Sequence, residues 1–204
     1  MKGSNIAEIM CETIRDYESY YKYLRRDVHI EVLECVEFKI VAEYLNAIAS
    51  RKLTCTEYGK RSSIAKCLEN DAVILSMTFN SLFTPLNYVI KPGNLMDLLH
   101  SIAEFTKLRD KGMLSLEIAS LLRKYPEMTR EFLFTLIDIR DDVTSSESRA
   151  LTEECMNMIG KKEGNPILIR LFQMAKGERK NAAQAIRDVV PRLRRRVMVS
   201  IANQ

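Results

Sequence analysis

The sequence contains no tryptophan and few of the residues that interrupt regular structure, with only 7 glycines and 5 prolines among 204 residues. Few segments alternate apolar and polar residues with a period of two, which argues against an extensive β-sheet. No apolar run approaches the roughly 20 residues that a membrane-spanning helix needs. The N-terminal stretch MKGSNIAEIMCET has no signal-peptide core. These absences predict a soluble, cytosolic, helical protein.

Groups of residues that carry out catalysis are also missing. His29 and His100 have no Cys, Ser or paired carboxylate at a meaningful local spacing, so we expect surface or half-buried structural roles. There is no phosphate-binding glycine loop, nucleophile elbow or His-Glu-X-X-His helix. Asp138, Asp141 and Asp142 lack the spacing of a calcium loop and read better as a solvated acidic helix end. We predict no catalytic residues, no cofactor and no metal.

The five cysteines contain no Cys-X-X-Cys pair, whereas a structural zinc site needs four ligands with short paired spacings. Cys35, Cys67 and Cys155 fall among apolar positions of predicted helices, where a buried thiol acts as a small hydrophobe. We therefore expect reduced structural thiols.

Apolar residues recur at three- and four-residue spacing through most of the chain, which predicts an all-α protein. The first predicted helix is capped by Ser4 or Asn5, the second runs from about His29 to Ser50, and the third is capped by Thr56. The predicted inward stripes are Ile6, Ile9, Met10, Ile14, Tyr17 and Leu24, then Leu33, Val36, Ile40, Tyr44 and Ile48, then Ile64, Leu68, Ala72, Leu75, Phe79 and Leu82.

The first helix also carries the tyrosine group Tyr17, Tyr20, Tyr21 and Tyr23, which we expect to pack in the core with the hydroxyls at a wet edge. The alternative is contact with further helices of a longer protein. In that case the first helix should present exposed apolar surface.

Two breaks follow the third helix, at Thr84-Pro85-Leu86-Asn87 and at Pro92-Gly93. Asn94 can cap a short helix through Phe105 and Leu108, which ends before Asp110-Lys111-Gly112.

The stretch LLRKYPEMTREFLFTLIDIRDDV, residues 121 to 143, predicts a helical hairpin. Pro126 disfavours helical geometry at Tyr125, so one helix ends there, and Thr129 can cap the next. Tyr125 should pack back onto the hairpin. The second helix should bury Phe132, Leu133, Leu136 and Ile139.

The order of these residues resembles the C-terminal end of the exocyst component three family, which includes the tumour-necrosis-factor-induced M-Sec and exocyst-component-three-like proteins. One block is Leu-Leu-Arg-Lys-Tyr-Pro-Glu followed by the helix that ends in Ile-Arg-Asp-Asp. A second joins Glu31 to Cys35 with Val41-Ala42-Glu43-Tyr44-Leu45 and Ser50-Arg51-Lys52. A third runs from Lys60-Arg61 through Leu68 and Asp71-Ala72 to Leu82. The resemblance covers roughly residues 10 to 158.

The resemblance implies the antiparallel helical bundles of a tethering-complex rod, of which this chain is the C-terminal portion. It implies a non-catalytic role in tethering and docking vesicles for exocytosis, or in forming membrane protrusions in the M-Sec branch. The implied partners are exocyst subunits, SNARE proteins or a Ral-type GTPase. The implied location is cytoplasmic, with peripheral association with the plasma membrane or secretory vesicles.

Charge divides the chain at about residue 160. Residues 161–204 hold 11 Lys and Arg against 3 Asp and Glu, a net charge of +8, whereas residues 1–160 carry a net charge of −4. We therefore expect a helical bundle region over 1–160 and a basic helical extension, outside the resemblance, over 161–204. The extension begins with an apolar helix that carries Ile167, Leu168, Leu171 and Phe172.

The end of this extension predicts a basic amphipathic helix, although Pro191 removes one of its backbone hydrogen bonds and bends its axis. Its apolar stripe comprises Ile186, Val189, Val190, Leu193, Val197 and Ile201. Such a helix can lie on an anionic membrane, or its stripe can pack onto the acidic body. The candidate contacts with a membrane or an acidic partner are Arg187, Arg192, Arg194, Arg195 and Arg196.

The alternative function is a basic helical nucleic-acid-binding or regulatory protein unrelated to the exocyst. The basic extension could hold phosphate groups without sequence preference. Phe172 is its only aromatic residue, so it offers no platform for base stacking, and this disfavours nucleic acid as the partner.

Overall fold

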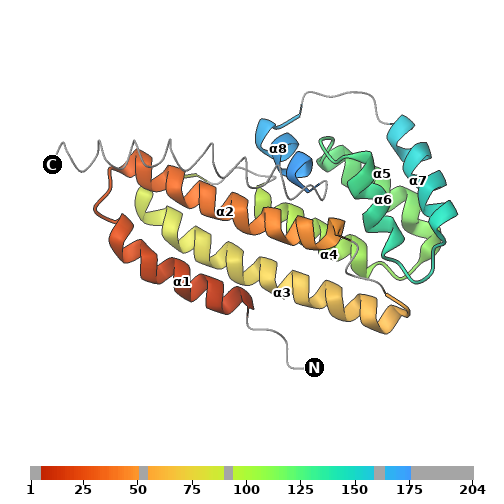
Figure 1. Cartoon of the computed structure of the whole chain (residues 1–204), viewed down its shortest axis with the longest axis horizontal. Coiled ribbons are helices and arrows are strands. Elements are labelled where there is room, and N and C mark those ends of the chain that lie inside the picture. Colours follow the sequence, from red (N-terminus) through yellow and green to blue (C-terminus); the bar gives the residue numbers. More distant parts are fainter. Residues whose placement is uncertain (1–5, 51–54, 90–93, 159–163, 176–204) are drawn as a thin grey trace.

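The computed structural model describes residues 6–50, 55–89, 94–158 and 164–175. Within these ranges the chain forms eight α-helices and two short 3-10 segments, with no β-strand (Figure 1). The predicted all-α class is therefore confirmed. No helix in the described ranges is long and apolar enough to span a membrane.

Three long helices form one half of the molecule: α1 (Ile6–Tyr21), α2 (Arg26–Ala49) and α3 (Tyr58–Phe83). α2 runs antiparallel to its two neighbours (Figure 1). α1 runs parallel to α3, because Cys11 Sγ lies 4.0 Å from the Ile74 carbonyl and the Arg15 guanidinium donates to Thr78 Oγ1 at 3.0 Å. α1 thus lies along the pair formed by α2 and α3.

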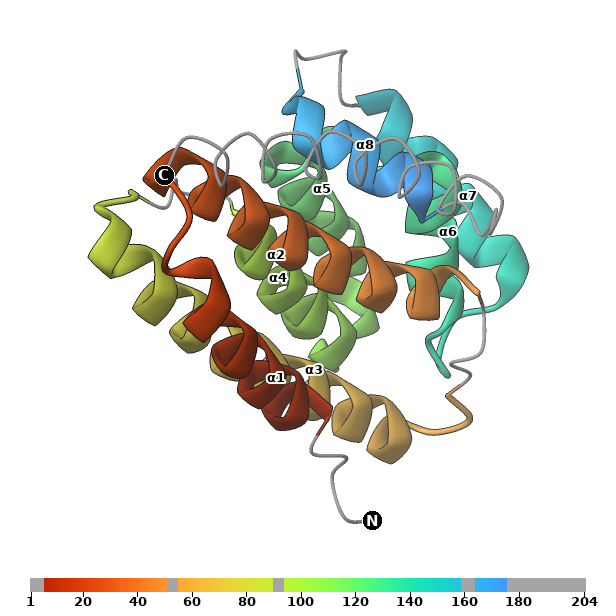
Figure 2. The ribbon, with the colours of Figure 1, turned by 60° about the vertical axis from the view of Figure 1, so that its left-hand side comes forward.

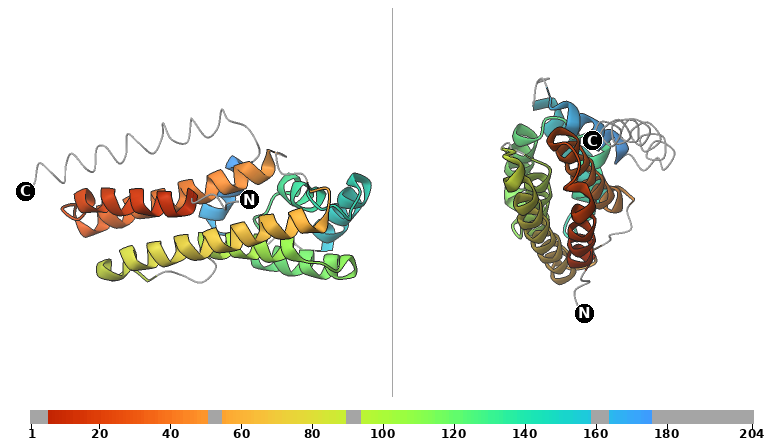
Figure 3. Two further views of the ribbon diagram at one scale, coloured as in Figure 1. Left: turned by 90° about the horizontal axis from the view of Figure 1, so that it is seen from below. Right: turned by 90° about the vertical axis from the view of Figure 1, so that its left-hand side faces the viewer.

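The remaining helices cover the other side and one end of that pair. α4 (Leu95–Lys107) packs along α3, and α5 (Leu114–Lys124), α6 (Arg130–Asp138) and α7 (Ser145–Met158) gather beyond it (Figure 2). α8 (Pro166–Met174) lies against α2, on the side of the bundle away from α3 (Figure 3). The shorter helices thus extend the three-helix layer at one end.

The predicted hairpin is confirmed. α5 ends at Lys124 because Pro126 follows, and Tyr125 is fully buried with its hydroxyl 3.4 Å from that of Ser101 on α4. The Thr129 hydroxyl accepts a hydrogen bond from the Phe132 N–H at 3.3 Å and so caps α6. The four residues predicted to line the inner face of α6 are all buried, namely Phe132, Leu133, Leu136 and Ile139.

The other breaks have a physical cause in the structure. The helical segment after α3 ends at Asn87, whose φ of 50° places it in the left-handed region. Asn94 caps α4 by accepting from the Asp97 N–H at 2.9 Å. The predicted Thr56 cap is wrong, because Glu57 is the N-cap residue of α3 and Thr56 Oγ1 accepts from Lys60 Nζ instead. Ser4, Asn5 and Pro92-Gly93 lie outside the described residues.

One hydrophobic core contains residues from all eight helices. The α3 prediction is the most accurate, with Leu68, Ala72, Leu75 and Phe79 buried. In α2 the predicted Leu33 and Ile48 are buried, while the most buried line runs through Val41, Ala42 and Leu45. The predicted Val36, Ile40 and Tyr44 are half-buried because they lie beside that line.

Two further expectations need correction. Cys67 is exposed and Cys35 is half-buried, whereas Cys11 and Cys155 are the buried thiols. All five cysteines are free, so the prediction of reduced thiols fits the structure. His29 lies inside α2 and is buried, although a surface or half-buried position was expected.

The first part of the basic extension packs onto the body. Leu168, Leu171 and Phe172 are buried, and the Phe172 ring meets the Phe132 ring of α6 edge to face, with centroids 5.3 Å apart. The Arg170 guanidinium also lies 5.4 Å from the ring centroid of Phe38 on α2. Residues 164–175 therefore share the core of the preceding helices, and the functional division at residue 160 stays a prediction.

Candidate functional site

The histidines do not form a catalytic group with each other. His100 on α4 lies 3.6 Å from Glu104, one turn further along the same exposed face. His29 packs near the Tyr21 ring, and its buried Nε2 has no hydrogen-bond partner among the described residues. Burial lowers the pKa of His29 despite the nearby Glu18 charge. A neutral, structural histidine accounts for this environment.

No cluster of three or more His, Cys, Asp or Glu side chains suited to a metal ion occurs within the described ranges. The strongest polar grouping is instead built around two buried arginines, Arg61 on α3 and Arg140 after α6, which are 1% and 3% exposed. We call Arg61, Arg140, Asp141 and Asp142 the arginine cluster. A buried guanidinium requires charged or carbonyl partners on most of its N–H groups, and both arginines have them.

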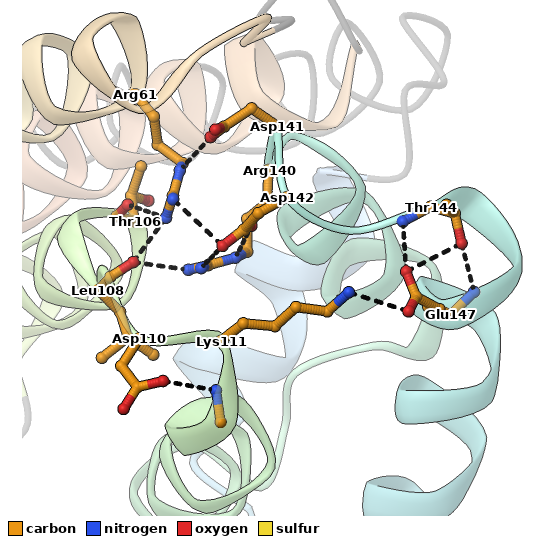
Figure 4. Close-up of polar contacts among 11 residues, drawn as sticks. Arg61, Thr106, Leu108, Asp110, Lys111, Arg140, Asp141, Asp142, Thr144 and Glu147 are labelled. Atoms are coloured by element: carbon orange, nitrogen blue, oxygen red, sulfur yellow. Dashed lines mark hydrogen bonds and ion pairs between the residues drawn. The ribbon is translucent and has the colours of Figure 1, made fainter.

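Arg61 joins three separate parts of the chain (Figure 4). Its Nε donates to Asp141 at 2.7 Å, and its Nη2 lies 3.4 Å from Asp142. Its Nη1 donates to the carbonyl of Leu108 at 2.6 Å and, at 3.3 Å, to that of Thr106. Arg61 therefore satisfies carbonyl groups at the C-terminal end of α4 and ties α3 to the loop between α6 and α7.

Arg140 completes the same connection. Its Nε and Nη2 form a two-pronged contact with the Asp142 carboxylate at 2.9 and 2.6 Å, and its Nη1 donates to the Leu108 carbonyl at 3.0 Å. Burial raises the pKa of Asp142, but the hydrogen bonds and charge of Arg140 and the charge of Arg61 outweigh burial, so this pKa is lowered overall. Asp142 therefore stays ionised at neutral pH.

These contacts correct the interpretation of the acidic helix end. Asp141 and Asp142 were expected to be solvated, but they neutralise buried arginines, and Asp138 accepts a hydrogen bond from Ser145 Oγ at 2.7 Å. The sequence contained one usable signal. Arg61 falls four residues before Ala65, on the buried stripe that continues through Leu68, and a cation at such a position requires a buried partner.

A second polar group reinforces the loop before α7 (Figure 4). The Glu147 carboxylate accepts from the Thr144 N–H at 2.8 Å, and the Thr144 hydroxyl accepts from the Glu147 N–H at 3.3 Å, which is a capping box. The Thr144 N–H, Lys111 and the Thr144 hydroxyl lower the pKa of Glu147 to about 2. The arginine cluster and this box hold a structural joint and supply no nucleophile or acid–base pair.

A group of exposed apolar side chains lies on α1. Four side chains on one side of this helix are more than half exposed, and we call them the α1 outer face: Ile6 (55%), Ile9 (59%), Tyr17 (55%) and Tyr20 (72%). The core instead contacts Ala7 and Cys11. The predicted core packing of the tyrosines is therefore wrong for Tyr17 and Tyr20, because the buried side of α1 is rotated away from them. It is also wrong for Tyr23, which follows the end of α1 and is exposed.

A groove of about 420 Å³ lies where α2, α6, α7 and the end of α8 meet. Its floor includes Ala49, Phe132 and Ala175, and its rim includes Arg130 and Glu153, which form an ion pair. The groove has mixed charge and no buried unpartnered cation among its described lining residues. The five arginines proposed from the sequence, Arg187, Arg192, Arg194, Arg195 and Arg196, lie outside the described residues.

Comparison with known proteins agrees with this scaffold-like arrangement. The family model described as exocyst complex component Sec6 matches residues 2–145. The chain belongs to the Sec6 family. The alternative of a protein unrelated to the exocyst is thereby set aside.

Members of the Sec6 family among the curated proteins match most of this chain. The exocyst complex component 3 of Caenorhabditis elegans is 30% identical over 178 residues, which are 87% of this chain and 22% of the relative. The exocyst complex component 3-like protein of Danio rerio is 28% identical over 144 residues, which are 71% of this chain and 18% of the relative. This chain thus spans about a fifth of the length of these Sec6 relatives.

A solved structure shows the same fold. The crystal structure of M-Sec superposes with a TM-score of 0.63 at 21% sequence identity, and the match covers 80% of this chain and 28% of that one. At this identity the likeness supports the fold alone. It agrees with the helical architecture that the sequence resemblance implied for a Sec6 family member.

Proposed function

We propose that this chain is a non-catalytic helical scaffold that takes part in tethering and docking vesicles for exocytosis, as an exocyst subunit or a relative of one. The observation that carries the proposal is the Sec6 family match over residues 2–145. The arginine cluster adds physical support, because it ties α3 to the end of α4 and to the loop between α6 and α7. A rigid scaffold of this kind acts by presenting surfaces to partners.

The proposed partners are other exocyst subunits, with SNARE proteins and a Ral-type GTPase as further candidates from the family resemblance. The proposed location is the cytoplasm, in peripheral contact with the plasma membrane or secretory vesicles. Formation of membrane protrusions, as the resemblance to the M-Sec branch implies, is a finer proposal for the same scaffold. None of these roles requires a catalytic group or a cofactor.

Affinity purification from cells tests the tethering proposal. The full chain carrying a small tag is expected to recover exocyst subunits, and nuclease treatment should not reduce the amount recovered. A tagged helical protein of similar size and charge serves as the control. Recovery of RNA-dependent partners alone, or of the same proteins as the control, would contradict the proposal.

We also propose that the basic extension contacts an anionic membrane through Arg187, Arg192, Arg194, Arg195 and Arg196. Each arginine near an anionic surface contributes about 1 kcal/mol, and the contribution falls with added salt. The net charge of +8 over residues 161–204 and the apolar stripe of the predicted helix support this proposal.

Liposome sedimentation distinguishes a specific contact of the basic extension from nonspecific attraction between positive charge and the membrane. Changing Arg192, Arg194, Arg195 and Arg196 to Gln should weaken binding to phosphoinositide-containing vesicles. The matched control changes four exposed basic residues of the body to Gln, namely Lys22, Lys66, Arg123 and Arg149. Equal loss of binding in both variants would show a nonspecific charge effect and contradict the assignment to the extension.

A further inference from the structure

The α1 outer face is unusual for a helix of a bundle, because its larger apolar side chains point away from the core. An amphipathic helix normally turns its largest apolar residues inward, but the buried residues of α1 are the small Ala7 and Cys11. The exposed side carries the two isoleucines and two tyrosines of the α1 outer face, and the Tyr17 and Tyr20 rings lie 6.3 Å apart. Aromatic side chains gathered in this way are typical of a protein–protein interface.

The two flanks of this face differ in chemistry. On one flank, Glu8, Glu12 and Asp16 are exposed and follow one another at four-residue spacing, and we call them the acidic row. On the other flank lie the half-buried apolar side chains of Met10 and Ile14, which pack against the core. The face is therefore an apolar strip with negative charge along one side only.

The acidic row is not neutralised within the part of the chain that the structure describes. None of its three carboxylates forms an ion pair with a described residue. Arg15, next to Asp16 in the sequence, instead donates to Thr78 Oγ1 on α3 at 3.0 Å. Burial raises the pKa of Asp71 on α3, and the charge of Glu8 adds to this effect, so the negative potential reaches the neighbouring helix. Like charges at this spacing repel one another, and a basic partner relieves the repulsion.

These features restrict what can cover the face. At 1.5 Å per helical residue, the strip from Ile6 to Tyr20 is about 21 Å long, which matches an α-helix of similar length. A second copy of α1 lacks the complementary charge, because Arg15 is the only Lys or Arg in this helix. An anionic membrane is repelled by the acidic row. The complementary occupant is an amphipathic helix with cations along one flank.

We propose that the α1 outer face binds an amphipathic helix of a partner protein, whose apolar stripe covers Ile9, Tyr17 and Tyr20 and whose basic flank lies against the acidic row. Docking removes apolar surface from water, which is favourable in proportion to the area removed. The opposite charges select partners with cations on the correct flank. This inference assigns a surface that the tethering role leaves unassigned, and it does not depend on that role.

A pair of designed peptides tests the charge on the partner's flank. Each forms a helix of about 16 residues with a leucine stripe. One peptide has lysines at four-residue spacing on one flank, and the other has glutamates at the same positions. Fluorescence anisotropy with the full chain should show about tenfold tighter binding of the lysine peptide. Equal binding of the two peptides, or no binding of either, would contradict the proposal.

Exchanging charges on α1 tests whether the acidic row makes this distinction. Changing Glu12 and Asp16 to Lys should reverse the preference, with about a tenfold loss for the lysine peptide and a similar gain for the glutamate peptide. The matched control changes two exposed residues elsewhere to Lys, namely Glu104 on α4 and Glu154 on α7, and should leave the preference unchanged. The same response in both variants would show a general charge effect and overturn the assignment to α1.

Photocrosslinking locates the apolar contact. A benzoylphenylalanine at Tyr20, which is 72% exposed, should crosslink to the lysine peptide, whereas the same probe at Leu116, 56% exposed on α5, should not. Ile9→Ser should weaken binding of the lysine peptide, because Ile9 contributes apolar area, and Leu116→Ser should leave binding unchanged. Both positions are exposed, so circular dichroism should show folded variants. Crosslinks from Tyr20 to the same chain or to a second copy in place of the peptide would overturn the proposal.

Discussion

At the scale of single residues, buried charged groups join segments of the chain that lie far apart in sequence. Arg61 is 1% exposed and satisfies its N–H groups with two carboxylates and two carbonyls. Such a pair contributes little net energy relative to an apolar substitute, but removing one partner leaves a buried charge without compensation. The cluster therefore selects one arrangement of α3, α4 and the loop that precedes α7.

We predict that Arg61→Ala lowers the free energy of unfolding by about 3–5 kcal/mol, because Asp141 and the Thr106 carbonyl lose their arginine partner while the Leu108 carbonyl keeps Arg140 alone. Urea denaturation followed by circular dichroism measures the change. Arg123→Ala removes an exposed arginine and should change stability by no more than about 0.5 kcal/mol. Similar small effects of both variants would show that the cluster does not hold the joint.

Glu37 gives a pH-dependent prediction at the same scale. Burial and the charge of Glu34 raise the pKa of Glu37 to about 7 from 4.5. Because the folded-state pKa is the higher one, the fold favours the neutral acid, and stability present below pH 4.5 is lost as the pH rises through about 7. The full difference corresponds to about 3 kcal/mol.

Glu37→Gln should therefore stabilise the protein at pH 8 relative to wild type and have a smaller effect at pH 5. Thermal unfolding at the two pH values measures this difference. Glu154→Gln, which changes an exposed carboxylate, is the matched control. A gain of stability that is the same at both pH values would contradict the titration of Glu37.

At the scale of elements, the start of a helix is stabilised by the side chain that accepts a hydrogen bond from one of its free N–H groups. Asn94 and Thr129 have extended backbone geometry and accept from the third N–H beyond them, so they cap α4 and α6. Thr56 is of the same residue type as Thr129 but lies before the N-cap residue of α3. Residue type therefore indicates which residues can cap a helix, and the backbone conformation decides whether the capping hydrogen bond forms.

We predict that Thr129→Ala lowers the unfolding free energy by about 1 kcal/mol, because the Phe132 N–H loses its acceptor. Thr56→Ala makes the same chemical change at an exposed position without a capping hydrogen bond to the backbone and should be nearly neutral. Denaturant midpoints of the two variants provide the comparison. An equal cost for both would refute the assignment of the cap.

At the scale of the whole molecule, one core joins the long helices to the shorter ones and to α8. The Phe132–Phe172 contact connects α6 with a helix that begins more than twenty residues later, and α8 also packs on α2. A single core of this kind unfolds cooperatively. The α1 outer face lies outside this core and leaves apolar side chains exposed.

We predict that Leu171→Ala, at a fully buried position of α8, lowers the midpoint of one cooperative unfolding transition and costs about 2–5 kcal/mol. Ile167→Ala lies on the same helix at 52% exposure and should cost much less. Differential scanning calorimetry distinguishes the two variants. If Leu171→Ala instead abolished a separate, lower-temperature transition of the wild type and left the main transition unchanged, α8 would be an independent unit.

The sequence by itself determined the helical class, the hairpin at Pro126, the cap at Asn94 and the family. These features depend on local rules: proline ends a helix, a polar side chain caps one, and apolar residues at three- and four-residue spacing make one side of it buried. The stripe of α3 was predictable for the same reason, because Leu68, Ala72, Leu75 and Phe79 occupy a single face.

Only the tertiary structure decided which side of α1 is buried and what Asp141 and Asp142 do. Ala7 and Cys11 are buried because their small side chains allow α1 to approach its neighbours closely, and this leaves the larger Ile9 and Tyr20 outside. Arg61 and Asp141 are 80 residues apart in sequence, and no local rule pairs them. Their contact follows from the packing of α3 against distant helices, which brings one buried cation to one carboxylate.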